Sequence, residues 1–264
     1  MFKRLINRSR QPALAKLIGA LDYYRFPELR AKSDGPLPRL RGALDYYFLP
    51  DTRASWGGPL NGQQERRRMV TTLLRQVGIE AIVETGTYRG TSTEFFADLC
   101  AGPVVTIEAD RRFYGYSRAR LWKRRNVTGL LADSRVGLRT LIDDDRLKGR
   151  RVLFYLDAHW GQDLPLAEEL DLIFEHWSQA VVLVDDFQVP DDAGYAFDDY
   201  GEGKALTPAY AAGALAKCAL TPFFPTAHSS EETGAKRGCI VLAAHADVIQ
   251  ALRGVDGLRV ASGA

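Results

Sequence analysis

The stretch IEAIVETGTYRGTSTE, residues 79–94, decides the fold of this chain. It begins with an apolar run typical of a buried strand, passes through the glycine turn TGTYRG and enters a segment with helical spacing. Thr91 is followed three residues later by Glu94, a pairing that predicts a capping box at the start of the helix. A strand, a glycine turn and a helix in this order are typical of one unit of a parallel α/β sheet.

The same alternation continues on both sides of this stretch. A helix is expected at 63–77, further strands at 103–110, 127–133, 151–158 and 180–186, and helices at 111–125, 134–142 and 164–176. Continuous apolar strands separated by helices predict a sheet that is covered on both faces.

The C-terminal part of the chain departs from this alternation. After an expected helix at 207–217, the segments 219–224 and 238–244 read as two strands with no crossover helix between them. Such a pair is expected to lie antiparallel at one edge of the sheet. We therefore predict a doubly wound, mostly parallel seven-stranded α/β sheet with an antiparallel edge strand.

An N-terminal extension, residues 1–62, precedes the expected main domain at 63–264. Residues 1–41 contain ten Lys or Arg and three acidic residues, and the motif GALDYY occurs at 19–24 and again at 42–47. Two copies are too few for a solenoid. We expect the repeated segments to pack on the main domain or on a second subunit. Packing on a second subunit would make the protein a homodimer through this extension.

The composition restricts the classes of partner and location. The chain has 264 residues and a net charge of +2, so no global field favours nucleic acid or an anionic membrane. The basic run at 111–125 is expected to be a solvated helix face. No apolar stretch is long enough to span a membrane. Three cysteines without CxxC spacing predict neither a disulfide framework nor a zinc site, so a cytoplasmic protein is expected.

Polar residues follow the ends of the expected strands, where a doubly wound sheet binds its ligand. Gly86 lets the backbone approach a ligand, and Gly90 lets the next helix start close to its strand. Glu108, about 20 residues after the turn, suits the two hydroxyls of a ribose. Asp133 and Ser134 end the third strand, within reach of an adenine edge. Together these positions predict an adenosine-containing cofactor.

The motif Glu84-Thr-Gly86-Thr-Tyr-Arg-Gly90 resembles the first motif of the class I S-adenosylmethionine-dependent methyltransferases, an acidic residue followed by G-x-x-x-G. The resemblance covers residues 63–244 and implies the Rossmann-like methyltransferase fold. It implies the following cofactor contacts: Glu84, Gly86, Thr87, Tyr88, Gly90 and Ser92 at the methionine end, Glu108 at the ribose, Asp133 and Ser134 at the adenine, and Asp157 and Trp160 as further residues of the pocket.

A second group of residues has the character of a reaction centre. Asp157 and His159 follow the fourth expected strand, and Asp185 and Asp186 end the fifth. Carboxylates that meet without a counter-charge raise one another's pKa, and a divalent cation such as Mg²⁺ removes that cost. The arrangement resembles the metal-dependent O-methyltransferases of the catechol and macrocin types. That resemblance implies Asp157, Asp185 and Asp186 as metal ligands, and a small-molecule hydroxyl, on a sugar or natural product, as acceptor. The catechol-type enzymes carry a lysine close to the position of His159, which Gly161 or Gln162 cannot replace, so His159 is the nearest candidate base and, with Asp157, the candidate catalytic group.

Other interpretations of the same residues stay open. The acids can cap helices or turns without binding a metal, and His159 can act as a base in a metal-independent methyltransferase. An NAD-dependent or nucleotide-sugar enzyme uses the same edge of such a sheet, although the chain lacks G-x-G-x-x-G and a Tyr-x-x-x-Lys pair. A cofactor-binding subunit without chemistry is a further alternative. The loops at 187–204 and 225–238 are expected to form a lid or to be mobile surface loops.

Overall fold

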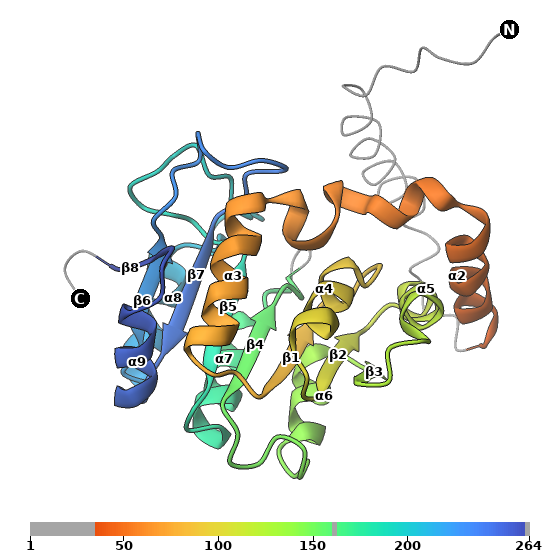
Figure 1. Ribbon diagram of the computed structural model, residues 1–264, viewed down its shortest axis with the longest axis horizontal. Coiled ribbons are helices and arrows are strands. Elements are labelled where there is room, and N and C mark those ends of the chain that lie inside the picture. The colour runs from red at the N-terminus through yellow and green to blue at the C-terminus, as the bar shows by residue number, and fades with distance from the viewer. Residues whose placement is uncertain (1–34, 160–162, 262–264) are drawn as a thin grey trace, which may run out of the picture.

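The computed structural model describes residues 35–159 and 163–261, which form one sheet with helices on both faces (Figure 1). Its eight strands lie in the order β3-β2-β1-β4-β5-β7-β6-β8. The strands are β1 Ala81–Thr85, β2 Val104–Glu108, β3 Val127–Leu131, β4 Val152–Leu156, β5 Val181–Asp185, β6 Thr221–Pro225, β7 Cys239–Ala243 and β8 Leu258–Val260. Strands β1 to β5 are parallel, and β7 runs antiparallel to both β5 and β6.

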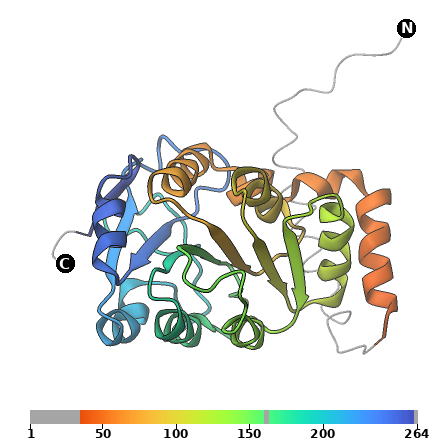
Figure 2. The same ribbon diagram turned by 60° about the horizontal axis from the view of Figure 1, so that its bottom comes forward.

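The helices cover the sheet in two layers (Figure 2). They are α2 Leu37–Phe48, α3 Gln64–Gln76, α4 Thr91–Leu99, α5 Arg111–Leu121, α6 Ser134–Leu141, α7 Leu166–His176, α8 Pro208–Lys217 and α9 Ala246–Arg253, with the 3₁₀ segments η2 Pro50–Gly57 and η3 Pro59–Gly62. One core packs α3, α4 and α9 against the sheet, and the other packs α6, α7 and α8. Successive residues of β4 alternate between the two cores: Leu153 and Tyr155 face one, and Phe154 and Leu156 the other. Burial on both faces explains why the strands are apolar without interruption.

The predicted doubly wound fold is confirmed, with one more strand than expected. Strand β8 pairs antiparallel with the far edge of β6, and α9 leads into it. Neither α9 nor β8 was expected from the sequence. Three residues are too few to show an alternating pattern, so no strand was expected at 258–260.

The expected capping box at the start of α4 is wrong. Gly90, in the left-handed conformation with φ 70°, is the N-cap residue, and Thr91 is already helical. Glu94 reaches away from the helix terminus and forms an ion pair with Arg120 of α5 at 3.0 Å. Only a residue that tolerates positive φ fits the sharp entry into this helix, so the glycine replaces a side-chain cap.

Helix α2, which carries the second GALDYY copy, packs across α5 (Figure 1). A Cβ at Gly42 would lie 1.8 Å from the carbonyl oxygen of Arg112, and a Cβ at Gly115 would lie 2.0 Å from that of Arg39. Asp45 adds an ion pair to the Arg112 guanidinium at 2.6 Å. The basic helix α5 is therefore covered by α2 along one side.

The first GALDYY copy, at 19–24, lies outside the described residues. The domain boundary after residue 62 and the homodimer stay predictions. Within 35–159 and 163–261, no helix has the length and apolar character needed to cross a membrane.

Candidate active site

The site is built where the parallel strands end. Thr85 of β1 lies beside Ile107 of β2 and Leu156 of β4, and Leu156 lies beside Val184 of β5. The residues that follow these positions therefore meet at one edge of the sheet, as the sequence predicted. The Asp157 amide donates a hydrogen bond to the Thr85 carbonyl at 3.0 Å, which extends the pairing of β1 and β4 into the site.

The glycine turn lies between the ends of β2 and β4 and contacts both. The Gly86 amide donates to the Ile107 carbonyl at 3.0 Å, and a Cβ at Gly86 would lie 2.2 Å from the carbonyl oxygen of Asp157. The backbone is left-handed at Gly86, Tyr88 and Gly90, with φ of 83°, 49° and 70°. No side chain fits at Gly86, so the turn contributes only backbone atoms where it enters the site.

Two buried glutamates flank the turn. Glu84, 1% exposed, accepts hydrogen bonds from the Thr93 and Thr106 hydroxyls, and burial raises its pKa to about 7. Glu108 accepts from the Tyr88 amide at 2.6 Å and the Asp110 amide at 2.8 Å, and burial raises its pKa to about 8. Hydroxyl and amide donors are neutral, so they offset only part of the cost of burying a charge.

The remaining predicted cofactor residues occupy different environments. Asp133 caps α6 through the Arg135 amide and pairs with the Arg135 guanidinium, whose hydrogen bond lowers the pKa of Asp133. The Asp133 side chain is thus a helix cap in this structure, whereas Ser134 beside it is buried. The Ser92 hydroxyl accepts a hydrogen bond from the Leu60 amide, and Thr87 contacts Thr106. Trp160 lies outside the described residues.

The predicted carboxylates do come together at the ends of β4 and β5. Burial, followed by Asp185 and Asp186, raises the pKa of Asp157 well above its usual range. Burial and then Asp185 raise the pKa of Asp186 to about 7. A fourth acid, Asp198 from the loop after β5, adds to both effects. The cluster therefore contains one more acidic residue, Asp198, than the three predicted from the sequence.

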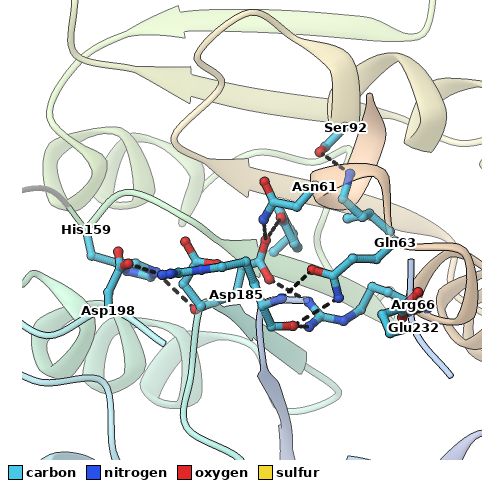
Figure 3. Close-up of polar contacts among 12 residues, drawn as sticks. Asn61, Gln63, Arg66, Ser92, His159, Asp185, Asp198 and Glu232 are labelled. Carbon is cyan, nitrogen blue, oxygen red and sulfur yellow. Dashed lines mark hydrogen bonds and ion pairs between the residues drawn. The ribbon is translucent and has the colours of Figure 1, made fainter. Parts of the chain in front are cut away.

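Asp185 is fully buried and is matched by a guanidinium (Figure 3). Its Oδ1 lies 2.5 Å from Nη1 of Arg66, on the first turn of α3. Its Oδ2 accepts from the Tyr155 hydroxyl at 2.6 Å and from Nδ2 of Asn61 at 3.1 Å. Glu232 fixes the start of α3 by accepting from the Arg66 amide at 2.9 Å.

A second arginine, Arg237 in the loop between β6 and β7, holds the other acids. Its Nε lies 2.7 Å from Oδ1 of Asp186, and its Nη2 pairs with Asp198. Gln63 fixes the Arg237 backbone at both ends, donating to the carbonyl at 3.0 Å and accepting from the amide at 2.8 Å. Ala196 forms a β-bridge with Arg237, so the two loops expected to form a lid contact each other.

The residues do not fit the magnesium site predicted for Asp157, Asp185 and Asp186. In the part of the chain that the structure describes, no three or more His, Cys, Asp or Glu side chains are arranged to hold a metal ion. Both oxygens of Asp185 already have donors, and Asp186 faces a guanidinium. Arginine provides the counter-charge that the prediction gave to Mg²⁺.

His159 lies beside this cluster and is 2% exposed. Its Nε2 is 3.3 Å from the Asp185 carbonyl oxygen, and its own carbonyl accepts from the Tyr200 hydroxyl at 2.7 Å. Its Nδ1 is buried and has no hydrogen-bond partner among the residues that the structure describes. Burial lowers the pKa of His159, which favours the neutral imidazole. A neutral ring that donates through Nε2 has a free acceptor at Nδ1.

Comparisons with known proteins agree with this fold. No family model matches the chain, and no curated protein sequence matches it. The methyltransferase domain of bacterial CtHen1-C has a TM-score of 0.50 and 15% identity, covering 71% of this chain and all of that domain. The O-methyltransferase TomG from Streptomyces achromogenes, solved with its cofactor, has a TM-score of 0.49 and 19% identity over 91% of this chain and all of TomG. At such identities the likeness establishes the fold, which is that of the class I methyltransferases.

Proposed function

We propose that this protein is an S-adenosylmethionine-dependent methyltransferase that methylates a hydroxyl group of a small molecule, a sugar or a natural product, with His159 as the base. The observation that carries the proposal is the free, buried Nδ1 of His159, placed at the cofactor edge of this fold. Most buried polar atoms have partners, so an unpartnered acceptor at this position is suited to a proton from the substrate.

The residues at the ends of β1 and β2 fit the cofactor. Glu108 stands where a ribose is held in such sheets, the thin turn at Gly86 leaves room for the methionine end, and Ser134 lies on the adenine side. The Asp157 carboxylate forms no ion pair with any residue in the described ranges, so a sulfonium supplies the positive charge it lacks. The bound cofactor provides an electrophilic methyl group.

The protein's own residues prepare the acceptor. The Asp185 carbonyl oxygen accepts from Nε2 of His159, which leaves Nδ1 to accept the proton of the acceptor hydroxyl. Tyr200 fixes the His159 backbone, and the negative charges of Asp198 and Asp185 stabilise the protonated ring. No step passes through a metal, because two of the three carboxylates predicted to bind one, Asp185 and Asp186, are held by Arg66 and Arg237.

Titration calorimetry separates the cofactor classes. We expect S-adenosylmethionine and S-adenosylhomocysteine to bind with micromolar affinity, of the order of −8 kcal/mol, and NAD not to bind. Binding of NAD alone would favour the oxidoreductase or nucleotide-sugar interpretation. Binding of neither compound would overturn the proposal.

His159→Ala tests the chemistry. Loss of a general base lowers kcat about 10²–10⁴-fold, and cofactor affinity is expected to stay unchanged because the ring acts on the acceptor. An unchanged kcat, measured at saturating cofactor, would remove His159 from the role of base.

A further inference from the structure

The acidic cluster at the ends of β4 and β5 concentrates negative charge, and the fold supplies the counter-charge from an unexpected source. Four aspartates, Asp157, Asp185, Asp186 and Asp198, lie near one another, and after burial the charges of Asp185 and Asp198 raise the pKa of both Asp157 and Asp186. Carboxylates in such proximity need positive charge nearby, and hard divalent cations are the usual partners of several oxygen ligands.

Arg66 and Arg237 supply that charge from outside the strands that carry the acids. Arg66 comes from α3, before the first strand, and its side chain is buried against Asp185 (Figure 3). Arg237 comes from the loop between β6 and β7 and joins Asp186 to Asp198. Arg66 also donates to the carbonyl oxygen of Arg237, so the two arginines form one connected unit. We call this unit, Arg66 and Arg237, the arginine pair.

We propose that the arginine pair takes the place of a divalent cation in this site, and that Arg237 excludes metal ions from Asp157, Asp186 and Asp198. A guanidinium fills the space between two carboxylates with a fixed planar fork, and it carries its charge at all physiological pH values. It cannot bind the acceptor oxygen as a metal does, so deprotonation is left to His159. The role of His159 in deprotonation rests on the proposed function, whereas the exclusion of metal ions by Arg237 does not.

The inference makes a specific prediction for Arg237→Ala. Arg237 bridges Asp186 and Asp198, so removing its guanidinium leaves these two carboxylates without their shared cation and free to converge, together with the electrostatically coupled Asp157, on Mn²⁺ or Mg²⁺, which prefer oxygen ligands. Arg237 is the better of the two arginines to remove, because its side chain is 22% exposed and that of Arg66 is 2% exposed.

The test is Mn²⁺ binding, measured by electron paramagnetic resonance on the purified full chain without cofactor. We expect at least roughly tenfold tighter binding in Arg237→Ala than in the wild type, and loss of the gain in Arg237→Ala/Asp198→Asn. Arg237→Lys, which keeps a positive charge, is expected to behave as the wild type. Arg259→Ala is the matched control, because Arg259 pairs with Asp191 of the same loop away from the cluster.

Equal Mn²⁺ binding in the wild type and Arg237→Ala, whether strong or absent, would overturn the inference. Circular dichroism shows whether each variant is folded, and Arg237→Met replaces Arg237→Ala if the alanine variant is not. Because metal binding is measured without turnover, a failure here is distinguishable from a failure of the methyltransferase proposal, which the cofactor titration decides.

Discussion

The two halves of the site bury acidic groups by different means. At the ends of β1 and β2, Glu84 and Glu108 accept hydrogen bonds only from hydroxyls and backbone amides. At the end of β5, Asp185 and Asp186 are paired with guanidinium groups. Burial raises the pKa of both glutamates to near or above neutrality, so protonation relieves their charge. Burial and Asp185 also raise the pKa of Asp186 to about 7, but both aspartates have a guanidinium partner.

The half with Glu84 and Glu108 thus has the properties of a binding surface, and the half with Asp185 and Asp186 has those of a fixed, charged framework. A carboxyl group surrounded by neutral donors keeps lone pairs for a ligand and adjusts its protonation when that ligand binds. A carboxylate tied to a buried arginine is fixed in place, and it fixes the loops that supply its partners. In the function proposed above, the first half receives the cofactor and the second holds the base in position.

The largest expected effect comes from breaking the framework half. Arg66→Met leaves Asp185 as an uncompensated buried charge, and we expect the free energy of unfolding to fall by about 3–5 kcal/mol, as measured by urea denaturation. Arg68→Met is the control, because Arg68 lies on the same helix with its side chain 70% exposed and is expected to change stability by less than about 0.5 kcal/mol. Equal losses in both variants would contradict a framework role for the buried pair.

A smaller effect, in the binding half, depends on pH. Glu84 has a pKa of about 7 in the folded protein against an ordinary value of 4.5, so its contribution to stability is full below pH 4.5 and is lost as the pH rises through 7. Between pH 5.5 and 8 the wild type should therefore lose about 2 kcal/mol relative to Glu84→Gln, whose amide does not ionise. Urea unfolding of both proteins at the two pH values measures this. A pH-independent difference would mean that Glu84 stays in one protonation state.

The smallest expected effect concerns Asp133, whose side chain is 43% exposed. Asp133→Ala removes the cap of α6 and is expected to cost about 1 kcal/mol of stability and to raise the KM for the cofactor a few-fold, with kcat unchanged. Asp144→Ala is a matched control, because Asp144 bonds to Arg146 with the same spacing as Asp133 to Arg135, outside the site. A KM increase of equal size in the control would assign the effect to stability instead of adenine binding.

The fold could be predicted well from the sequence because the patterns that indicate strands, turns and helices each lie within a short segment of the chain. The glycine turn at Gly86 and the strand-end acids Glu108, Asp157 and Asp185 follow directly from short apolar runs, and their meeting at one edge follows from parallel pairing. The errors at Thr91 and β8 are local as well. A glycine in the left-handed conformation replaced the expected cap, and a three-residue strand gave no pattern.

The counter-charges in the site were not predictable in this way. Arg66 lies 119 residues from Asp185, and Arg237 lies 51 residues from Asp186. Nothing in the spacing around Arg66 distinguishes it from the neighbouring exposed Arg68. An acidic cluster indicates that positive charge is needed, but the sequence leaves open whether a metal ion or a distant arginine supplies it.

The 119-residue separation between Arg66 and Asp185 also has a meaning for how the protein assembles. Contacts between distant parts of a chain carry a high loop-closure cost and form after local ones. The turn between β1 and α4 is made of neighbouring residues, whereas the ion pair requires that β4 and β5 already lie beside β1. A chain that has formed only its first strands thus has the glycine turn without the Arg66–Asp185 ion pair, so the site proposed above is complete only when folding is complete.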